Sequence, residues 1–511
     1  MTLHNKSVRD IVIVGGGTAG WMSAAALANQ FKQQPVKITL IDSSDIGTVG
    51  VGEATIPTIR RFYQKLGFTD HQVMQATNAT CKLGIEFKDW YQPDSSFIHP
   101  FGLYGQSVNH IPFHHYWLKL KHQGDTTPLA KYSLGVQLAQ HNKFMPCIAK
   151  PQNQLEIFDW ALHFDATRFA NLMRDYSLKQ GVIHIDSLIE SVTTNKNNGD
   201  ISALTLANGQ CIEGDLFIDC SGFKGLLINK TLNVDYHDWS EWLVCDRAIA
   251  IQSESVNQPA PRTIVTAHEA GWQWTIPLQH RQGNGHVYSS RFTDDDTAKQ
   301  QLLDNIHGPL IGKPRTFKFV PGRRDKAWAH NVVAIGLASG FLEPLESTSI
   351  ALVETAIDKL LQALSSKNYN QQVINRFNEV TALEYERVRD FIILHYKANQ
   401  RSEPMWQYCQ TMNLPRSLEQ KIEAYLTGGE LQRLPWEIFG PDSWLAIFDG
   451  FKLWPRKYHQ KIDKMPIEMI DNGLKKMEQD ITNLMKNASD HSQFLVNNFN
   501  CHLPTNTKVS S

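Results

Sequence analysis

The sequence predicts an α/β fold with a mixed β-sheet and a mainly helical C-terminal part. Three observations support this prediction: a strand, helix and strand pattern in residues 8–42, short strand-like runs with turn signals in residues 181–335, and helical periodicity after residue 335. At 511 residues the chain is longer than most single domains, so we expect two or more structural units.

Residues 8–42 have the pattern of a β-α-β unit. The run from Val8 to Val14 ends in four consecutive branched apolar residues, as expected of a buried parallel strand. Trp21 to Phe31 is rich in Ala, Leu and Met, which is typical of a helix. A second apolar strand, Val36 to Ile41, follows this helix and ends at Asp42.

From Gly181 onward the pattern changes to short β-strands. The pairs Asn198-Gly199 and Asn208-Gly209 predict two hairpins with type I′ turns. They lead to another buried strand, residues 216–219, and mixed strands continue to about residue 335.

The C-terminal part contains a helix with one apolar stripe. Its apolar residues alternate spacings of three and four: Ile467, Ile470, Leu474, Met477, Ile481 and Leu484. We expect this helix to pack on the body of the protein rather than to form an intersubunit coiled coil. Residues 504–511 are expected to form a polar tail.

Composition excludes several classes of protein. The chain is 42% hydrophobic and contains 13 Trp, 24 Phe and 14 Tyr, enough for a large core, so it is not a disordered protein. Its formal net charge of -1 argues against a nucleic-acid binder, which needs a basic face. No apolar segment is long enough to suggest a signal peptide or a membrane span, and we expect a cytoplasmic protein.

Cysteines and histidines indicate neither a disulfide framework nor a metal site. The seven cysteines are scattered without a Cys-x-x-Cys pair, which fits reduced thiols. His110, His114 and His115 are close in sequence, but Pro112 interrupts any helix that would align them. The G-x-S-x-G motif of many hydrolases is absent around Ser221.

A glycine motif follows the first strand. Residues 15–20 satisfy G-x-G-x-x-G at the start of a helix, and Asp42 lies about 20 residues further on, which together predict a dinucleotide site rather than a mere tight turn. Gly15 would make the turn, Gly17 would let the backbone approach a pyrophosphate, and Gly20 would allow close helix packing. Asp42 would accept hydrogen bonds from a ribose. The motif alone leaves FAD and NAD both open.

Three further segments carry a resemblance to a known family. They are residues 50–57 (GVGEATIP), 271–277 (GWQWTIP) and 341–348 (FLEPLEST). Together they resemble the flavin-dependent tryptophan halogenases, and the G-W-x-W-x-I-P run is the most specific of the three. The resemblance extends from about Val8 into the 390s and so covers most of the chain.

The resemblance implies a Rossmann-like FAD/NAD(P)-binding fold of the flavin monooxygenase type. Residues 1–365 are expected to form an FAD-binding domain with an interleaved substrate-side β-sheet, and residues 366–511 a mainly helical part that covers the substrate site. The implied cofactor contacts are Gly15, Gly17, Thr18, Ala19, Gly20, Asp42, Gly52, Glu53, Ala54, Leu337 and Ile350.

The resemblance also implies the reactants. A separate flavin reductase supplies FADH2, which reacts with oxygen and chloride or bromide to give hypohalous acid. This acid travels inside the protein to a lysine beside a small aromatic substrate, and the product is a halogenated ring. Nucleic acid and membrane partners are not expected, and a homodimer is left open.

The family's lysine matches Lys82. A lysine among apolar neighbours loses solvation, so its neutral amine becomes accessible and can hydrogen-bond hypohalous acid or form a haloamine. Without the resemblance, a lysine whose ammonium reaches solvent would be the simpler interpretation. Glu346 matches the glutamate near the reacting carbon, where a carboxylate stabilises the cationic ring intermediate or removes its proton. Glu346 could equally stabilise the start of the following helix.

The remaining site residues are implied by position in the matched segments. Backbone N–H groups of Thr348 and Ser349 would bind the halide. Well-known tryptophan halogenases carry glycine at the position of Ser349, and a serine there would be strained if the glycine has a positive φ. Trp272 and Trp274 would lie on one strand face near the flavin, although paired tryptophans are often simply core. His99 and Phe101 would flank the substrate ring, or be an ordinary loop histidine and core phenylalanine.

The resemblance fails in one segment. Halogenases acting on free tryptophan hold the amino-acid part of their substrate with a segment before the C-terminal helices, and residues 428–445 leave no room for it. We therefore expect a substrate without that handle: a simple indole, another electron-rich arene, or a larger indole-bearing molecule.

Two alternatives share the flavin signals. One is an FAD-dependent aromatic monooxygenase that hydroxylates its substrate, and the other is a flavin-binding protein without turnover. A monooxygenase should need neither the G-W-x-W-x-I-P run nor Lys82, and flavin binding alone does not require both Lys82 and Glu346 in matched contexts.

Overall fold

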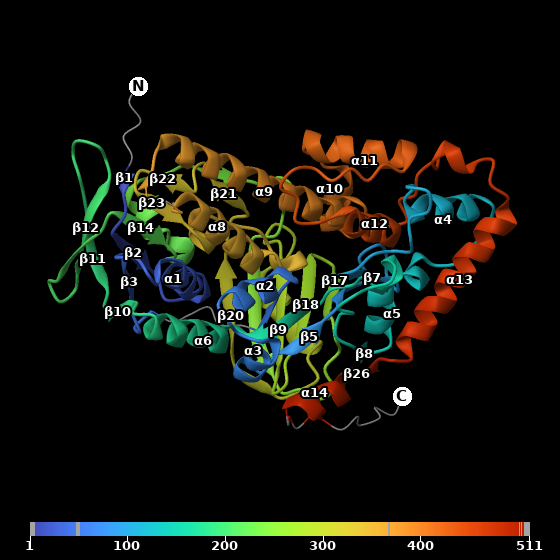
Figure 1. Ribbon diagram of the computed structural model, residues 1–511, viewed down its shortest axis with the longest axis horizontal. Helices are drawn as coiled ribbons and strands as arrows, with labels where there is room; N and C mark the ends of the chain where they lie inside the picture. Colours follow the sequence, from blue (N-terminus) through green and yellow to red (C-terminus); the bar gives the residue numbers. More distant parts are fainter. Residues whose placement is uncertain (1–5, 47–51, 366–367, 500, 502, 505–511) are drawn as a thin grey trace.

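The computed structural model describes residues 6–46, 52–365, 368–499, 501 and 503–504. A six-stranded sheet in the order β10-β3-β2-β14-β23-β22 lies at the left of Figure 1. Five of the strands run parallel, and only the edge strand β22 is antiparallel. The strands are β2 (Asp10–Val14), β3 (Lys37–Asp42), β10 (Ile183–Asp186), β14 (Leu216–Asp219), β22 (Trp328–Ala329) and β23 (Val332–Ala334).

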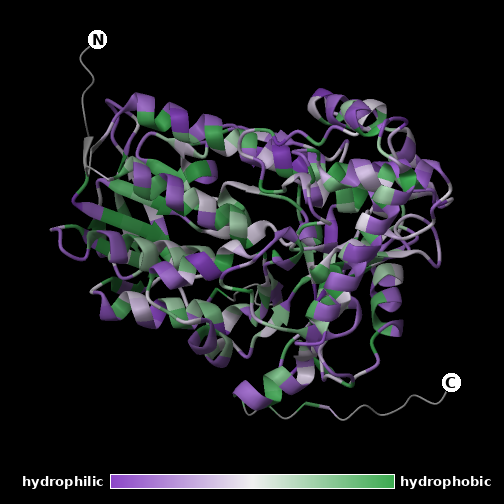
Figure 2. Cartoon of the chain, turned by 45° about the vertical axis from the view of Figure 1, so that its right-hand side comes forward, coloured by the Kyte–Doolittle hydropathy of each residue, from purple (hydrophilic) through white to green (hydrophobic). Residues whose placement is uncertain are grey.

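Helices cover one face of this sheet. The helix α1 (Thr18–Phe31) follows β2 and packs against both α6 (Ala166–Lys179) and α8 (Ser349–Ala363). Successive side chains of a strand point to opposite faces of the sheet. In β2, Ile11 and Ile13 belong to the main core, whereas Val12 and Val14 belong to a second core on the opposite face. The predicted β-α-β unit is confirmed, and Figure 2 shows its strands as predominantly hydrophobic.

The second core lies under a small antiparallel sheet and a π-helical turn. The sheet consists of β11 (Ile189–Thr194), β12 (Ile201–Leu206) and β13 (Cys211–Glu213), and the turn is η4 (Leu226–Thr231). Both predicted hairpins are present in this sheet.

The predicted type I′ turns are wrong. In each hairpin only the glycine has a positive φ, 76° at Gly199 and 81° at Gly209, whereas a type I′ turn also needs a positive φ at the preceding asparagine. Both loops are longer than two residues because the strands end earlier. The N–H of Gly209 donates to the carbonyl of Leu206, so a turn ending in one left-handed glycine closes the second hairpin.

A seven-stranded sheet occupies the centre of the molecule in the order β20-β16-β19-β18-β17-β6-β7. Its pairs are antiparallel except β17 with β6. The strands are β6 (Gly84–Lys88), β7 (Ser96–Pro100), β16 (Arg247–Ser253), β17 (Thr263–His268), β18 (Gly271–Pro277), β19 (Gln282–Tyr288) and β20 (Leu310–Lys318).

The chain also forms sheets smaller than the six-stranded and seven-stranded ones. A three-stranded sheet joins β4 (Gly52–Ala54), β9 (Ala161–Asp165) and β5 (Thr80–Lys82). The other pairings involve β1 (Lys6–Ser7) with β25 (Asn368–Tyr369), β8 (Lys143–Phe144) with β26 (Ser489–Asp490), and β15 (Tyr236–Asp238) with β21 (Gly322–Arg324) and β24 (Gly340–Phe341). Short helices between the strands are α2 (Thr58–Lys65), α3 (Asp70–Thr77), α4 (Phe113–His122), α5 (Leu134–Gln140) and α7 (Asp295–Asp304).

The chain after residue 368 is mainly helical. Its helices are α9 (Gln371–Lys397), α10 (Pro404–Thr411), α11 (Arg416–Gly428), α12 (Pro441–Gly450), α13 (Ile467–Met485) and α14 (His491–Phe499). The stripe of α13 faces α4 and α5 and buries Ile470, Leu474 and Ile481, so the prediction that it packs on the body is confirmed. Residues 505–511 of the predicted tail lie outside the described residues.

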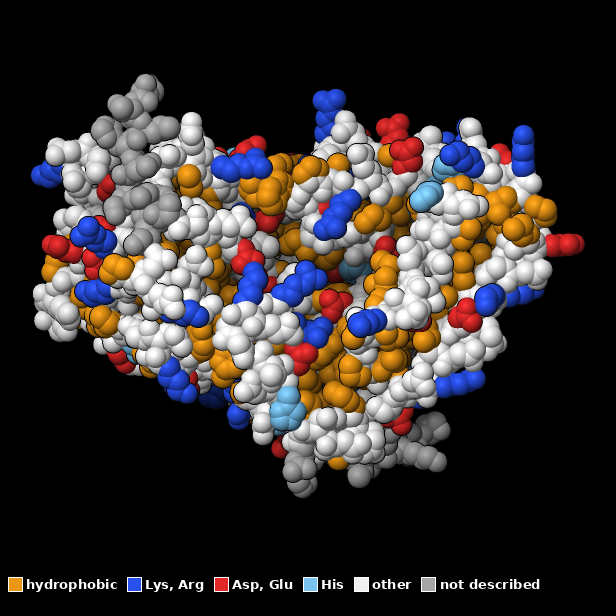
Figure 3. All heavy atoms as spheres, in the orientation of Figure 1, with side chains coloured by type: hydrophobic (Ala, Val, Ile, Leu, Met, Phe, Trp, Pro, Cys, Tyr) orange, Lys and Arg blue, Asp and Glu red, His pale blue; other side chains and the backbone are white. Residues whose placement is uncertain are grey.

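The surface carries charges of both signs. Figure 3 shows Lys and Arg side chains together with Asp and Glu side chains over the visible face. Among the described residues no helix has the length and apolar character needed to cross a membrane. The same residues contain no group of three or more His, Cys, Asp or Glu side chains arranged to hold a metal ion.

Candidate active site

The glycine motif forms a turn between β2 and α1. Gly15 has a φ of 109°, and a Cβ there would lie 2.4 Å from the carbonyl oxygen of Cys220. A Cβ on Gly20 would lie 1.8 Å from the carbonyl oxygen of Gly15. A Cβ on Gly17 would meet nothing within 4 Å, so this glycine faces open space at the N-terminus of α1. That arrangement fits a pyrophosphate approaching the backbone at Gly17.

Asp42 lies directly beside this turn. Its Oδ2 occupies the position where a Cβ on Gly16 would be, 1.6 Å away. Its Oδ1 is 2.6 Å from Nε2 of His184, on the neighbouring strand β10. Asp42 is therefore held at the edge of the turn by a histidine that sequence reasoning missed.

The other predicted flavin-side residues surround the same region. Thr18 and Ala19 are partly exposed in the first turn of α1. The 3-10 turn η5 (Gly336–Ala338), which contains Leu337, approaches α1: a Cβ on Gly336 would lie 3.0 Å from that of Ala19. The helix α8, with the buried residue Ile350, packs against both α1 and η5.

The strand β4 carries Glu53 and Ala54. The carboxyl of Glu53 lies among protein atoms, and this loss of solvation raises its pKa to about 7. Gly52 is the first residue of β4, whereas Gly50 and Val51 of the same predicted segment lie outside the described residues.

Lys82 is fully buried at the end of β5. Its Nζ donates to the carbonyl oxygen of Thr55, just after β4, at 2.9 Å, and to Oγ of Ser347 at 2.8 Å. The ring of Phe101 lies with its centroid 5.1 Å from Nζ. Burial lowers the pKa of Lys82 to about 7, although the nearby Glu346 carboxylate opposes this change. The amine thus connects the flavin-side strand β4 with the segment before α8.

The backbone of Ser347 is in the left-handed region of φ and ψ. It follows the 3-10 turn η6 (Pro344–Glu346) and has a φ of 58°, an unfavourable conformation of the kind that clusters at functional sites. The condition under which Ser349 would be strained is not met, because Ser349 begins α8 and is not among the residues with positive φ.

Glu346 is fully buried and bound by two histidines. Nδ1 of His99, on β7, lies 2.9 Å from Oε2, and Nε2 of His395, on α9, lies 2.8 Å from Oε1. Burial by itself would raise the pKa of Glu346, but the two histidines outweigh it and lower the pKa to about 2. The structure therefore brings Lys82, Glu346, His99 and Phe101 together, as the resemblance implies.

Aromatic rings from the C-terminal helical part adjoin His99. Phe391 and Phe439 stack with centroids 4.0 Å apart, and they lie 5.6 Å and 5.9 Å from the His99 ring. Trp444 packs edge-on against Phe391 at 4.9 Å. Sequence reasoning missed Phe391, Phe439 and His395. The one available signal was a histidine inside the apolar run of residues 391–394 and 396.

Trp272 and Trp274 lie on β18 with ring centroids 6.0 Å apart, and both are buried. The facing strand makes room for the second ring, because a Cβ on Gly285 would lie only 2.0 Å from it. The Nε1 of Trp272 is buried without a hydrogen-bond partner among the described residues.

The residues predicted to bind the halide, Thr348 and Ser349, lie at the start of α8. Thr348 is the N-cap residue, its side chain makes no capping hydrogen bond, and its buried Oγ1 has no partner among the described residues. The first N–H groups of a helix lack intrahelical acceptors and carry partial positive charge. Thr348 and Ser349 thus offer donors that an anion fits.

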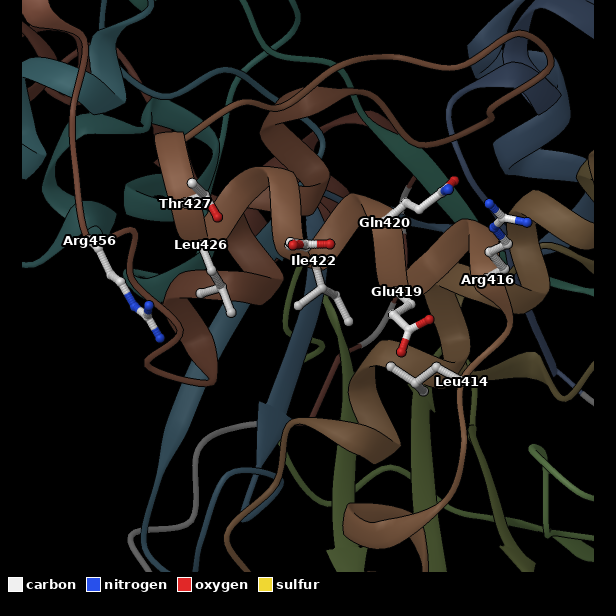
Figure 4. Close-up of a pocket in the computed structure, with 9 residues that line it drawn as sticks. Leu414, Arg416, Glu419, Gln420, Ile422, Leu426, Thr427 and Arg456 are labelled. Atoms are coloured by element: carbon white, nitrogen blue, oxygen red, sulfur yellow. The ribbon is translucent and has the colours of Figure 1, made fainter.

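A separate groove of about 620 Å³ lies on the outer side of the helical part. Figure 4 shows that α11 supplies most of its lining, with Leu414 and Arg456 at its edges. None of the predicted site residues lines this groove.

Comparisons with known proteins show the family of the chain. Residues 10–467 match the family model of tryptophan halogenase. The chain is 35% identical over 489 residues to tryptophan 6-halogenase ThaL of Streptomyces albogriseolus, covering 88% of this chain and 91% of that protein.

Two solved structures are similar over nearly the whole chain. BrvH, a flavin-dependent halogenase from Brevundimonas sp. BAL3, is 52% identical with a TM-score of 0.93, covering 96% of this chain and 99% of that chain. Xcc4156, a flavin-dependent halogenase from Xanthomonas campestris, is 41% identical with a TM-score of 0.93, covering 98% and 100%. The predicted fold class is confirmed by this similarity. Flavin-dependent halogenases use FAD, supplied as FADH2 by a partner flavin reductase, together with halide and oxygen, and they act on aromatic substrates. The chain therefore belongs to the tryptophan halogenase family and is a flavin-dependent halogenase.

Proposed function

We propose that this enzyme halogenates an indole or another electron-rich arene with chloride or bromide, through hypohalous acid delivered to Lys82. One observation carries the proposal: the Lys82 amine is fully buried, has a pKa lowered to about 7, and is held beside the residue that follows Glu346. A buried amine poised between its two protonation states is costly for stability and is typical of a functional site.

The two hydrogen bonds of Lys82 leave one position on Nζ free. A neutral amine that donates to Thr55 and Ser347 retains its lone pair, which can attack the halogen and release hydroxide that becomes water. An ammonium group retains a third N–H, which can donate to the oxygen of hypohalous acid. In the first route the hydroxide takes a proton from the halogenated amine to become water, and the proton displaced from the ring later restores the amine. In the second route the displaced ring proton leaves with the oxygen of hypohalous acid as water. In both routes the halogen replaces a ring hydrogen and one water is formed.

Glu346 would act chiefly as a fixed negative charge. With a pKa of about 2 and two N–H donors it stays ionised, so it stabilises the positive charge that develops on the ring and is a weak base. His99 and Phe101 would flank the ring, with Phe439 and Phe391 continuing the aromatic wall.

The flavin site would lie on the other side of Lys82. Reduced FAD, when bound, supplies the two electrons with which oxygen is activated to oxidise the halide. Gly15, Gly17, Thr18, Ala19 and Gly20 would hold its pyrophosphate, and Asp42 its ribose. Gly52, Glu53, Ala54, Leu337 and Ile350 would form further contacts. Thr348 and Ser349 would bind the halide, and Trp272 with Trp274 would keep the substrate away from the flavin. Residues 366–511 would cover the substrate site.

The segment before α12 gives no anchor for an amino acid. Its buried acid, Glu437, already accepts hydrogen bonds from Lys421 and from the N–H of Leu434, and its other acid, Glu430, is exposed. The neighbouring Phe439 presents an apolar ring to His99. A free amino acid would therefore leave its charged groups desolvated without partners, so we propose a substrate that lacks them.

A product assay tests the reaction class. The purified enzyme is incubated with FAD, a flavin reductase, NADH, bromide and indole, and the products are identified by mass spectrometry. We expect bromoindole. Hydroxyindole would instead indicate an aromatic monooxygenase, and retained FAD without any oxidised or brominated arene would indicate a flavin-binding protein.

A competition assay tests the substrate class. With indole and free tryptophan at equal concentration, we expect kcat/KM for indole to be at least about 10-fold higher, since the zwitterion finds no partner in the site. A wide preference for free tryptophan, with a single regioisomer as product, would contradict the proposed substrate.

A further inference from the structure

His395 faces hydrogen-bond acceptors from both of its ring nitrogens. Nδ1 lies 2.8 Å from the carbonyl oxygen of Phe391, one turn earlier on α9, and Nε2 lies 2.8 Å from Oε1 of Glu346. The ring is fully buried. The opposite ring orientation would place carbon atoms against both oxygens and lose both hydrogen bonds.

The hydrogen-bond partners determine the protonation states of His395 and Glu346. A backbone carbonyl has no proton, so Nδ1 must donate to Phe391. An ionised carboxylate has none either, so Nε2 must also donate, and His395 then carries both protons and a positive charge. The other arrangement requires a protonated Glu346, which the second donor, Nδ1 of His99, disfavours because it stabilises the ionised form.

Aromatic rings surround His395 on several sides. Phe87 and Phe391 lie with their centroids 5.0 Å and 5.1 Å from it, and Phe451 and Trp90 lie at 6.2 Å and 6.3 Å. The rings of Phe391, Phe451 and Trp90 lie at 81°, 83° and 80° to the imidazole ring. These apolar neighbours keep water away from His395, so its hydrogen bonds to Phe391 and Glu346 decide its protonation state.

Few other titratable groups face the pair of His395 and Glu346, which lies on η6. They are His99 on β7 and Lys82 on β5. On the same helix, Asp390 is paired with Arg389 and Ser417, and Tyr396 donates to Glu343. No second carboxylate among the described residues hydrogen-bonds His395, so Glu346 is its counter-ion.

We propose that His395 is a buried imidazolium that keeps Glu346 ionised and offsets part of its charge beside Lys82. It is a positioning residue, since it acts through Glu346 rather than on the substrate. Its functional consequence rests on the proposed halogenation, whereas its charge does not. Without this cation, the pKa of Glu346 would rise. As long as Glu346 stayed ionised, its uncompensated charge would favour the ammonium form of Lys82.

Nitrogen NMR of the FAD-loaded enzyme labelled with [15N]histidine tests the charge. The signal of His395 is assigned by its loss in His395→Gln, or by its change in Glu346→Gln if the first variant does not fold. We expect both ring nitrogens to stay protonated from about pH 6 to pH 8.5. His491 is the internal control: its Nδ1 faces the carbonyl of Pro259 and its Nε2 accepts from the N–H of Cys81, so it should be neutral with one bare nitrogen. A bare nitrogen on His395 in this range would overturn the proposal.

The pH profile of the reaction tests the positioning role. In His395→Gln we expect the acidic limb of the halogenation rate to move up by about one pH unit and the rate at pH 7 to fall about 5- to 10-fold, because the uncompensated charge of Glu346 raises the pKa of Lys82 from about 7 and leaves less of the neutral amine. An unchanged profile would overturn this role. If the wild-type enzyme halogenates nothing, the proposed function fails, but the NMR result still decides the charge of His395.

Discussion

Two glutamates three residues apart lie in opposite electrostatic environments. Both Glu343 and Glu346 are fully buried in the FLEPLEST segment. Glu346 has a histidine donor at each oxygen, and its pKa is lowered to about 2. Glu343 has the hydroxyl of Tyr396 at 2.6 Å from one oxygen, whereas its Oε2 has no hydrogen-bond partner among the described residues. Burial therefore raises the pKa of Glu343 to about 7, which the hydrogen bond from Tyr396 opposes only in part.

The comparison shows that neighbours far apart in the chain decide what each carboxylate can do. The donors to Glu346 lie 247 residues before it, on β7, and 49 residues after it, on α9. Only the assembled sheet and helix turn Glu346 into a fixed negative charge. Glu343, one turn away, spends part of its time neutral at physiological pH.

Replacing each of the two glutamates with glutamine should have its largest effect on the reaction rate. Glu346→Gln removes the negative charge beside the ring, and we expect kcat to fall by about 10²–10³-fold. Glu343→Gln resembles the neutral form that Glu343 already adopts near pH 7, so kcat should stay within about 3-fold. Both are measured as rates of bromoindole formation at saturating substrate. Equal losses in the two variants would contradict the assigned roles.

The same two substitutions should change the melting temperature in opposite directions at pH 8. The raised pKa of Glu343 means that the folded state loses stability as pH rises from 4.5 through about 7, so Glu343→Gln should raise Tm at pH 8 and change it little at pH 5. The lowered pKa of Glu346 means that its ionised form contributes stability at every pH above 4.5, so Glu346→Gln should lower Tm at pH 8. We expect shifts of about 2–4 °C. Shifts of the same sign in scanning calorimetry at pH 8 would show that the two environments do not differ as described.

Local patterns predicted the framework of the molecule. The β-α-β unit, the strand β14 and the amphipathic helix α13 were predicted because their periodicity is a property of the segment itself. The type I′ turns failed because the turn type depends on where the paired strands end. The boundary at residues 365 and 366 stays a prediction because it adjoins residues outside the described part of the chain, and the homodimer stays untested.

The site was predicted only where it coincided with sequence motifs. Lys82, Glu346, His99 and Phe101 meet in the structure, although their roles remain proposals. His395 and Phe439 have no motif of their own: each comes near the site because α9 or the segment before α12 packs over the sheet. The left-handed residue of this segment is Ser347 and not Ser349, which the motif could not show because a motif identifies residues but not their backbone angles.

The central claim is that a halogenating species reaches the substrate through the buried amine of Lys82. Lys82→Met tests it most directly, with FAD binding, NADH-dependent oxygen consumption and bromoindole formation measured on the same sample. We expect FAD binding and oxygen consumption within about 2-fold of wild type and a loss of bromoindole of at least about 10³-fold. Lys119→Met is the matched control, because Lys119 is also buried but donates only to the backbone carbonyls of Ile462, Asp463 and Met465. It should retain bromoindole formation. Bromination by Lys82→Met at the wild-type rate would contradict the account.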